Sequence, residues 1–144
     1  MAIYSQGANS TVGTTGVAAF DLKASATCAP KLLEFAVNLQ AGGASTYGIG
    51  RPGNDGSVTQ TAPVLVQAEN PADPAGQTGT TAAWGTAPTV PALFLRRIIF
   101  PNTIGVGAIW MFPRGITCQV NKGIVLWNSA SNSTNTNIWL VVDE

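Results

Sequence analysis

The chain has 144 residues, with seven Lys and Arg, seven Asp and Glu and no histidine, so its formal net charge is zero and only 10% of its residues are charged. Without an imidazole, histidine general bases, Ser/His/Asp and Cys/His nucleophiles and histidine metal ligands are all excluded. Balanced charge without a basic cluster also argues against binding to nucleic acid or to an anionic membrane surface.

The composition favours one all-β domain. A length of 144 residues suits a single domain, and 45% hydrophobic residues are enough for a packed core. Sixteen glycines and nine prolines indicate many turns and few long helices. Because an average soluble domain has about a quarter of its residues charged, this surface must be mostly neutral and polar. Copies of such a chain repel one another little, so we expect self-assembly.

The first third of the chain contains one clear strand. Residues 1–15 are small and polar, and we expect them to form an arm that becomes ordered on docking, followed by one domain over residues 16–144. Residues 16–23 are a short strand candidate. From residue 31 to 40, apolar side chains alternate with polar or small ones, which predicts a strand with one buried face. The apolar members of that face are Leu33, Phe35, Val37 and Leu39.

The middle of the chain is rich in turns. Residues 47–56 form a predicted turn-rich connection, and residues 63–69 a short strand. Residues 70–91 are rich in Pro, Gly, Thr and Ala, with Trp84 as their one large side chain. Because a structureless loop seldom exceeds about 12 to 15 residues, we expect this long segment to make an interface.

The second half predicts five strands joined by short turns, over residues 93–100, 104–112, 116–120, 123–127 and 137–142. With three strands from the first half the total is about eight. Short spacings favour antiparallel hairpins, and one or two long connections favour crossovers. The sequence therefore predicts an antiparallel, jelly-roll-like β-sandwich of about eight strands with a long irregular loop.

Few residues offer catalytic or metal chemistry. A carboxylate-based hydrolase would require Glu34 or Glu69 to face a second acid across a cleft. Cys28 and Cys118 lie far apart and fit no metal-binding spacing, and we expect buried free thiols rather than a disulfide. The start of the chain lacks the charge and apolar run of a secretory signal, and we expect synthesis in a cytoplasm. We therefore expect a protein that is not an enzyme, with no catalytic residue, cofactor or metal site.

Six large side chains are candidate interface residues. Arg96 and Arg97 are adjacent, so in a strand they point to opposite faces, and arginine is enriched at subunit boundaries. Three tryptophans lie in hydrophobic strands and are predicted to be core residues or subunit-interface anchors. The fourth lies in the long loop, where it can cap the core, dock a partner or stack on a sugar. The candidates are Trp84, Arg96, Arg97, Trp110, Trp127 and Trp139.

Several segments resemble small virion structural proteins of tailed bacteriophages. They are YGIGRP at 47–52, AAWGTAP at 82–88, RRIIFP at 96–101, GITC at 115–118 and GIVLWN at 123–128. The resemblance implies a capsid decoration or cement protein, which is a β-sandwich that assembles, often as a homotrimer, and binds the major capsid protein on the outside of an icosahedral shell. It implies no catalytic residues.

Two functions follow as expectations. The first is a non-enzymatic capsid decoration subunit, made in the host cytoplasm and located on the capsid surface of the virion. The second is a carbohydrate-binding module of a phage tail or receptor-binding tip, with a glycan stacked on Trp84.

Overall fold

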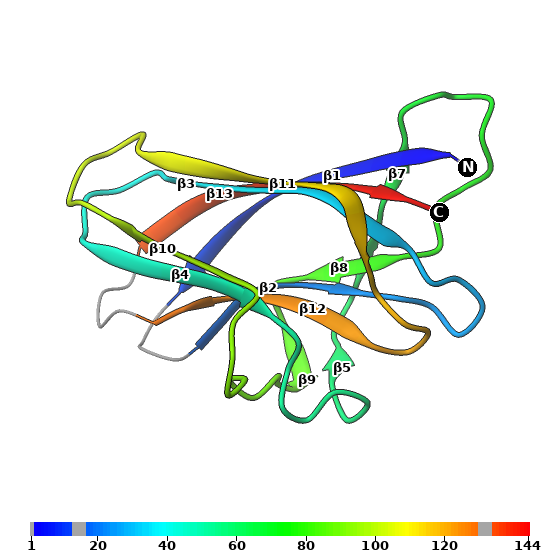
Figure 1. Cartoon of the computed structure of the whole chain (residues 1–144), viewed down its shortest axis with the longest axis horizontal. Coiled ribbons are helices and arrows are strands. Elements are labelled where there is room, and N and C mark those ends of the chain that lie inside the picture. The colour runs from blue at the N-terminus through cyan, green and yellow to red at the C-terminus, as the bar shows by residue number, and fades with distance from the viewer. Residues whose placement is uncertain (1, 13–16, 130–133) are drawn as a thin grey trace.

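The computed structural model describes residues 2–12, 17–129 and 134–144, and in these residues the chain forms strands and no helix. Two antiparallel sheets pack face to face as a sandwich (Figure 1). The predicted all-β antiparallel sandwich is confirmed, and a jelly roll is compatible with it. Eight of the described strands have at least five residues.

Sheet A has the order β11-β3-β13-β1-β7 and sheet B the order β10-β4-β12-β2-β8-β6. The strands of sheet A are β11 (Gly107–Thr117), β3 (Lys31–Leu39), β13 (Thr134–Asp143), β1 (Ile3–Val12) and β7 (Gln67–Ala68). Those of sheet B are β10 (Arg96–Phe100), β4 (Ser45–Gly50), β12 (Gly123–Asn128), β2 (Val17–Lys23), β8 (Gly79–Thr81) and β6 (Val64–Leu65). A separate ribbon pairs β5 (Thr59–Gln60) with β9 (Trp84–Thr86).

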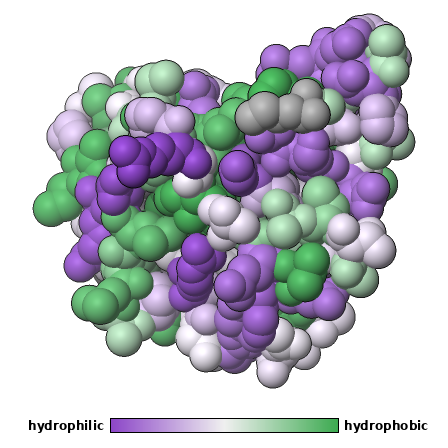
Figure 2. All heavy atoms as spheres, turned by 45° about the vertical axis from the view of Figure 1, so that its right-hand side comes forward, coloured by the Kyte–Doolittle hydropathy of each residue, from purple (hydrophilic) through white to green (hydrophobic). Residues whose placement is uncertain are grey.

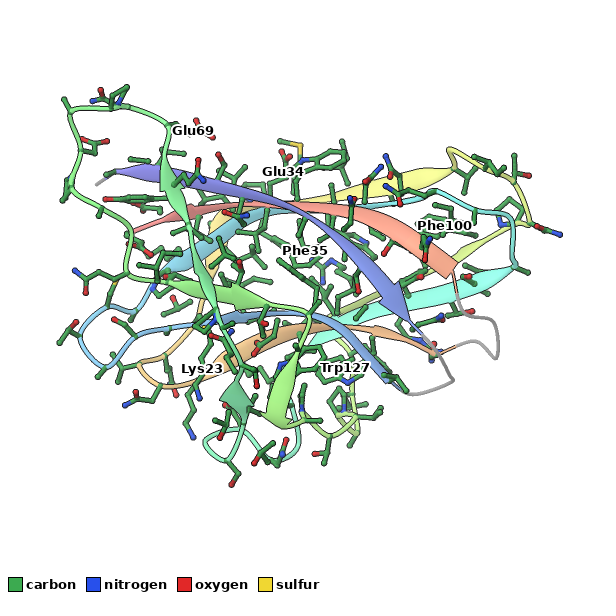
Figure 3. All side chains as sticks on the ribbon, turned by 180° about the vertical axis from the view of Figure 1, so that it is seen from behind. Lys23, Glu34, Phe35, Glu69, Phe100 and Trp127 are labelled. Carbon is green, nitrogen blue, oxygen red and sulfur yellow. The ribbon has the colours of Figure 1, made fainter. Side chains whose placement is uncertain are left out.

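The main core fills the space between the two sheets. In Figure 3, Phe35 of β3 points from sheet A toward sheet B, where its ring meets that of Phe20 edge-on, with centroids 6.4 Å apart. The alternation predicted for β3 is confirmed for Phe35, Val37 and Leu39, which are all buried. At the fourth position Leu32 is fully buried in place of Leu33, because the pairing with β13 shifts by one residue there. A bulge of this kind moves the following side chain to the other face.

The predicted N-terminal arm is wrong for residues 3–12. They form β1, whose ten residues all pair with β13, and whose other edge pairs with β7. This strand is not apparent in the sequence because it contains small residues such as Ala8 and Ser10. Pairing with the neighbouring strands, rather than a large apolar face, holds it in place. Of the remaining arm positions, Ala2 exchanges two backbone hydrogen bonds with Glu144, and residues 1 and 13–15 lie outside the described part of the chain.

Four other predictions also differ from the structure. The expected turn at 47–56 begins within β4, a central strand of sheet B. The strands predicted at 104–112 and 116–120 are one strand, β11, with a pairing irregularity between Met111 and Ile116. The strand predicted at 63–69 divides, since β6 joins sheet B and β7 joins sheet A, with Val66 buried between them. The long 70–91 segment contains β8 and β9.

Candidate functional site

The outer face of sheet B is covered by the chain's own loops. Ala18, Val125 and Trp127 form a second buried cluster there, and Trp84 and Phe94 pack over it. The ring of Phe94 meets Trp127 edge-on, with centroids 5.9 Å apart. Trp127 has no exposed surface, so of its two predicted roles the structure supports the core role and not an interface one.

A glycine allows this cover to lie close to the sheet. A Cβ at Gly48 would come within 2.6 Å of the Phe94 ring, closer than side chains approach one another. Gly48 is paired with Trp127 on the neighbouring strand. The absence of a side chain at Gly48 therefore lets Phe94 sit beside Trp127.

Among the described residues, Asp21 is the one carboxyl group whose pKa is strongly shifted. It was not among the candidate residues predicted from the sequence. It is fully buried under the cover, where its Oδ2 accepts hydrogen bonds from Trp84 Nε1 at 3.3 Å and Gln60 Nε2 at 3.2 Å. Burial raises the pKa of Asp21 to about 6, although those two hydrogen bonds act in the opposite direction. Its Oδ1 has no hydrogen-bond partner in the described part of the chain.

The surroundings of Asp21 favour a structural role for it. The nearby ammonium groups donate to backbone oxygens, Lys23 Nζ to Val58 and Lys122 Nζ to Asp55. Asp21 therefore joins sheet B to the β5–β9 ribbon through Gln60 and Trp84. The sequence does contain a signal for the burial of this carboxyl, because Asp21 alternates with the core residues Phe20 and Leu22 in a strand that is buried on both faces.

The two adjacent arginines point to opposite sides of β10, as predicted. The guanidinium of Arg96 lies 5.6 Å from the Phe112 ring centroid, on the side of the main core. That of Arg97 lies 5.1 Å from the Phe94 centroid, on the covered face of sheet B. Both side chains are exposed, and each binds an aromatic face through cation–π attraction.

Exposed apolar side chains lie near these arginines on both outer faces of the sandwich, Ile99 on that of sheet B and Met111 on that of sheet A. The outermost strands β10 and β11 lie on the same side of the sandwich (Figure 1). The four most exposed large apolar side chains of the described residues belong to this part of the chain, and together with β10 and β11 we call them the β10–β11 edge. They are Leu93 at 85%, Ile99 at 76%, Met111 at 71% and Ile104 at 69% exposure. The left half of Figure 2 shows hydrophobic surface gathered on this side, interrupted by strongly hydrophilic residues.

Two open hollows mark the β10–β11 edge. One, of about 510 Å³, is lined by Arg96, Met111, Arg114 and neighbouring residues. The other, of about 490 Å³, is lined by Thr46, Arg97, Ile98 and Ile99. Both combine apolar and guanidinium groups; the first contains residues of β10 and β11, and the second lies over the paired strands β4 and β10.

The structure does not bring the six predicted interface residues together. Arg96 and Arg97 lie on the β10–β11 edge, and Trp110 is half-buried against the main core. Trp139 is half-buried on the outer face of sheet A, where its Nε1 donates to Glu34 Oε1 at 2.8 Å. Trp84 and Trp127 belong to the covered face of sheet B, as described above.

The two acids of the hydrolase alternative lie apart. Figure 3 shows Glu34 on the outer side of sheet A and Glu69 beyond the end of β7. Cys28 and Cys118 are free thiols, as predicted; Cys118 is buried and Cys28 half-buried. In residues 2–12, 17–129 and 134–144 no helix is long and apolar enough to cross a membrane, and no three His, Cys, Asp or Glu side chains are grouped to hold a metal ion.

Comparison of the chain with protein-family models, with curated proteins and with solved structures finds no match. The resemblance to virion structural proteins therefore stays a prediction.

Proposed function

We propose that this chain is a structural subunit that assembles with copies of itself, as a homotrimer, and decorates the surface of a viral capsid. The observation that carries the proposal is the β10–β11 edge, where Leu93, Ile99, Ile104 and Met111 are each more than two-thirds exposed. Scattered exposed apolar residues are ordinary, whereas a concentration of them rimmed by polar groups marks an interaction surface. Unpaired edge strands also offer backbone groups to another chain.

The opposite side of the sandwich supports a head-to-tail contact between copies. There the outermost strands are β6 and β7, and Val64 and Leu65 of β6 are about half exposed. The acids Glu69 and Asp73 follow β7 in the chain. We call this surface the β6–β7 edge. One edge is therefore apolar with arginines, and the other is apolar with carboxylates.

This distribution of charge favours a ring over a twofold dimer. A twofold contact through the β10–β11 edge would bring Arg96, Arg97 and Arg114 close to their own copies. A head-to-tail contact instead places them against Glu69 and Asp73 of the next subunit. Contacts between unlike surfaces close into rings when the rotation between copies permits, and a trimer is such a ring. The low overall charge adds little repulsion between subunits or with a capsid.

The test has two parts, the mass of the assembly and its binding to shells. Sedimentation velocity should give three times the subunit mass of 14.8 kDa, and the protein should co-sediment with shells of the major capsid protein in many copies per particle. Ile99→Glu and Met111→Glu should yield folded monomers. Val120→Glu, which changes an exposed apolar residue in the β11–β12 turn, is the matched control and should stay trimeric.

Charge reversal gives a sharper form of the same test. Arg97→Glu should weaken the trimer, and adding Glu69→Arg should restore part of the lost affinity, because the opposite charges again face each other. A stable monomer without affinity for capsids would overturn the proposal. A few copies per virion would point instead to a tail component.

The alternative of a sugar stacked on Trp84 receives less support. Its indole N–H is held by the buried Asp21, and its ring packs over sheet B. Trp84 therefore serves as part of the chain's own cover.

A further inference from the structure

The outer face of sheet A has a different chemistry from both edges. The strand register aligns Gly7 of β1, Trp139 of β13, Ala36 of β3 and Ile109 of β11 in one row across the sheet. The next row consists of Asn9, Asn137, Asn38 and Gly107 on the same four strands. A single indole with small neighbours therefore lies beside a row of three amides.

Trp139 lies between two hollows. One, of about 510 Å³, is lined by Gly7, Asn9, Asn137 and Trp139. The other, of about 270 Å³, is lined by Asn38, Gly107, Ile109 and Trp139 among others. A Cβ at Gly7 would meet no atom within 4 Å, so the space on that side of the indole is open. A ligand can therefore reach the ring from both sides.

The indole is held in place by Glu34. Trp139 Nε1 donates to Glu34 Oε1 at 2.8 Å, and Figure 3 shows Glu34 on this outer side of the sheet. A fixed aromatic ring loses little conformational freedom on binding, which is the usual advantage of tryptophan as an anchor.

The amide row leaves hydrogen-bond donors for a ligand. Gln40 Nε2 donates to the Oδ1 atoms of Asn9 and Asn137, so the NH₂ groups of these two asparagines remain as donors. Asn38 Oδ1 is buried and has no hydrogen-bond partner among the described residues. That oxygen is therefore out of a ligand's reach, and the row offers amide N–H donors, which suit a ligand rich in hydroxyl oxygens.

We propose that this face binds a neutral glycan, with a sugar ring stacked on Trp139 and its hydroxyls hydrogen-bonded to Asn9 and Asn137. A sugar has an apolar face of C–H groups that covers an indole, and hydroxyls that donate and accept. The two hollows on either side of the indole suit an oligosaccharide better than a single sugar.

Other ligand classes fit this face less well. Neither row contains a lysine or arginine, so phosphates and acidic sugars gain no counter-charge. An apolar protein surface laid over the face would bury the amides without partners, which is costly. Gly107 and Ile109, on one side of the site, belong to β11, whereas Gly7 and Trp139 lie on β1 and β13, away from the β10–β11 edge. Variants at Gly7 and Trp139 therefore test glycan binding independently of trimer formation.

The experiment is a calorimetric titration of the full chain with neutral oligosaccharides of glucose, mannose, galactose and N-acetylglucosamine. At least one should bind, and Trp139→Ala should weaken that binding by about tenfold or more. Gly7→Val should have a similar effect, because the new side chain fills the hollow beside the indole without removing a native contact.

Gly85→Val is the matched control, since Gly85 lies in strand β9 and a Cβ there would approach no atom closer than 3.9 Å. Its affinity should equal that of the unmodified chain. Circular dichroism of each variant separates loss of the site from loss of the fold. The proposal is overturned if no neutral oligosaccharide binds at millimolar concentration, if only acidic glycans bind, or if folded Gly7→Val and Trp139→Ala variants bind as tightly as the unmodified chain.

Discussion

The buried carboxyl of Asp21 makes a quantitative prediction about stability and pH. Burial raises its pKa to about 6 from an ordinary value of 3.8, Lys23 acts in the opposite direction, and Asp55 adds to the increase. The Asp21 carboxyl therefore keeps its proton to a higher pH in the folded state than in the unfolded state. Stability from this group is complete below about pH 4, falls as the pH rises to about 6 and is constant above that.

The size of the effect follows from the shift. About two pKa units at about 1.4 kcal/mol each correspond to about 3 kcal/mol of stability lost between the acidic and neutral forms. Asn is neutral at every pH and keeps one oxygen to accept from Trp84 or Gln60. The Asp21→Asn variant should therefore lack this loss, and its advantage over the unmodified chain should grow by about 2 to 3 kcal/mol between pH 4 and pH 7.5.

Urea unfolding followed by tryptophan fluorescence at the two pH values measures this difference, provided that the m-values agree. The control for the loss of one negative charge is Glu69→Gln, which removes an exposed carboxylate after β7. Because Glu69 belongs to the β6–β7 edge, it is compared with Asp21→Asn in the monomeric Ile99→Glu background. If Asp21→Asn and the unmodified chain show the same change in the free energy of unfolding between pH 4 and pH 7.5, the assignment of a protonated Asp21 in the folded state is refuted.

Three further predictions follow from the packing. Gly48→Ala should lower the free energy of unfolding by about 1 to 3 kcal/mol because its Cβ overlaps the Phe94 ring, and in a Phe94→Ala background the penalty should shrink; an equal penalty in both backgrounds would contradict this contact. A thiol reagent should modify Cys28 before Cys118, since burial raises the pKa of Cys118 to about 12, whereas equal rates in the folded protein would argue against that burial. Deletion of residues 1–12 should abolish cooperative unfolding, measured by circular dichroism, because it removes β1 from between β13 and β7; a folded, soluble truncated chain would show that β1 is dispensable.

Strands with a strong local pattern of apolar residues could be predicted from the sequence. Alternation of large apolar and polar side chains located β3, and a strand rich in apolar residues located β12, β13 and most of β11. The prediction from sequence failed for β1, where small and polar residues give no strong hydrophobic period. That strand is specified by its two neighbours in the sheet, which are contacts distant in sequence.

The covered outer face of sheet B was also missed, and for a physical reason. A sandwich of two sheets is expected to have one buried face per sheet, so the sequence did not predict that Val125 is as buried as Ile124. It left Trp127 open between a core role and an interface role. All six residues of β12 are buried. An unbroken apolar run of this kind indicates a strand with both faces covered, and in the described residues Trp84 and Phe94 provide that cover.

The candidate sites depend on register, which the sequence does not display. Trp139 and the three asparagines are separated by up to 130 residues in the chain, and only the pairing of β1, β13 and β3 places them in adjacent rows. The predicted interface role of Arg96 and Arg97 stays a prediction, now with a defined surface around it.

The pairing of the first and last strands also determines how the molecule bears a mechanical load. Ala2 and Glu144 exchange two backbone hydrogen bonds, and the two ends of the chain lie together in Figure 1. Tension applied between them would separate β1 from β13 one pair at a time, as a zipper opens, and each step would break only one or two hydrogen bonds. Tension applied along the strands, between the start of β1 and the start of β13, would instead load all ten residue pairs at once. These two strands therefore separate more easily when pulled from residues 2 and 144 than when pulled along their length.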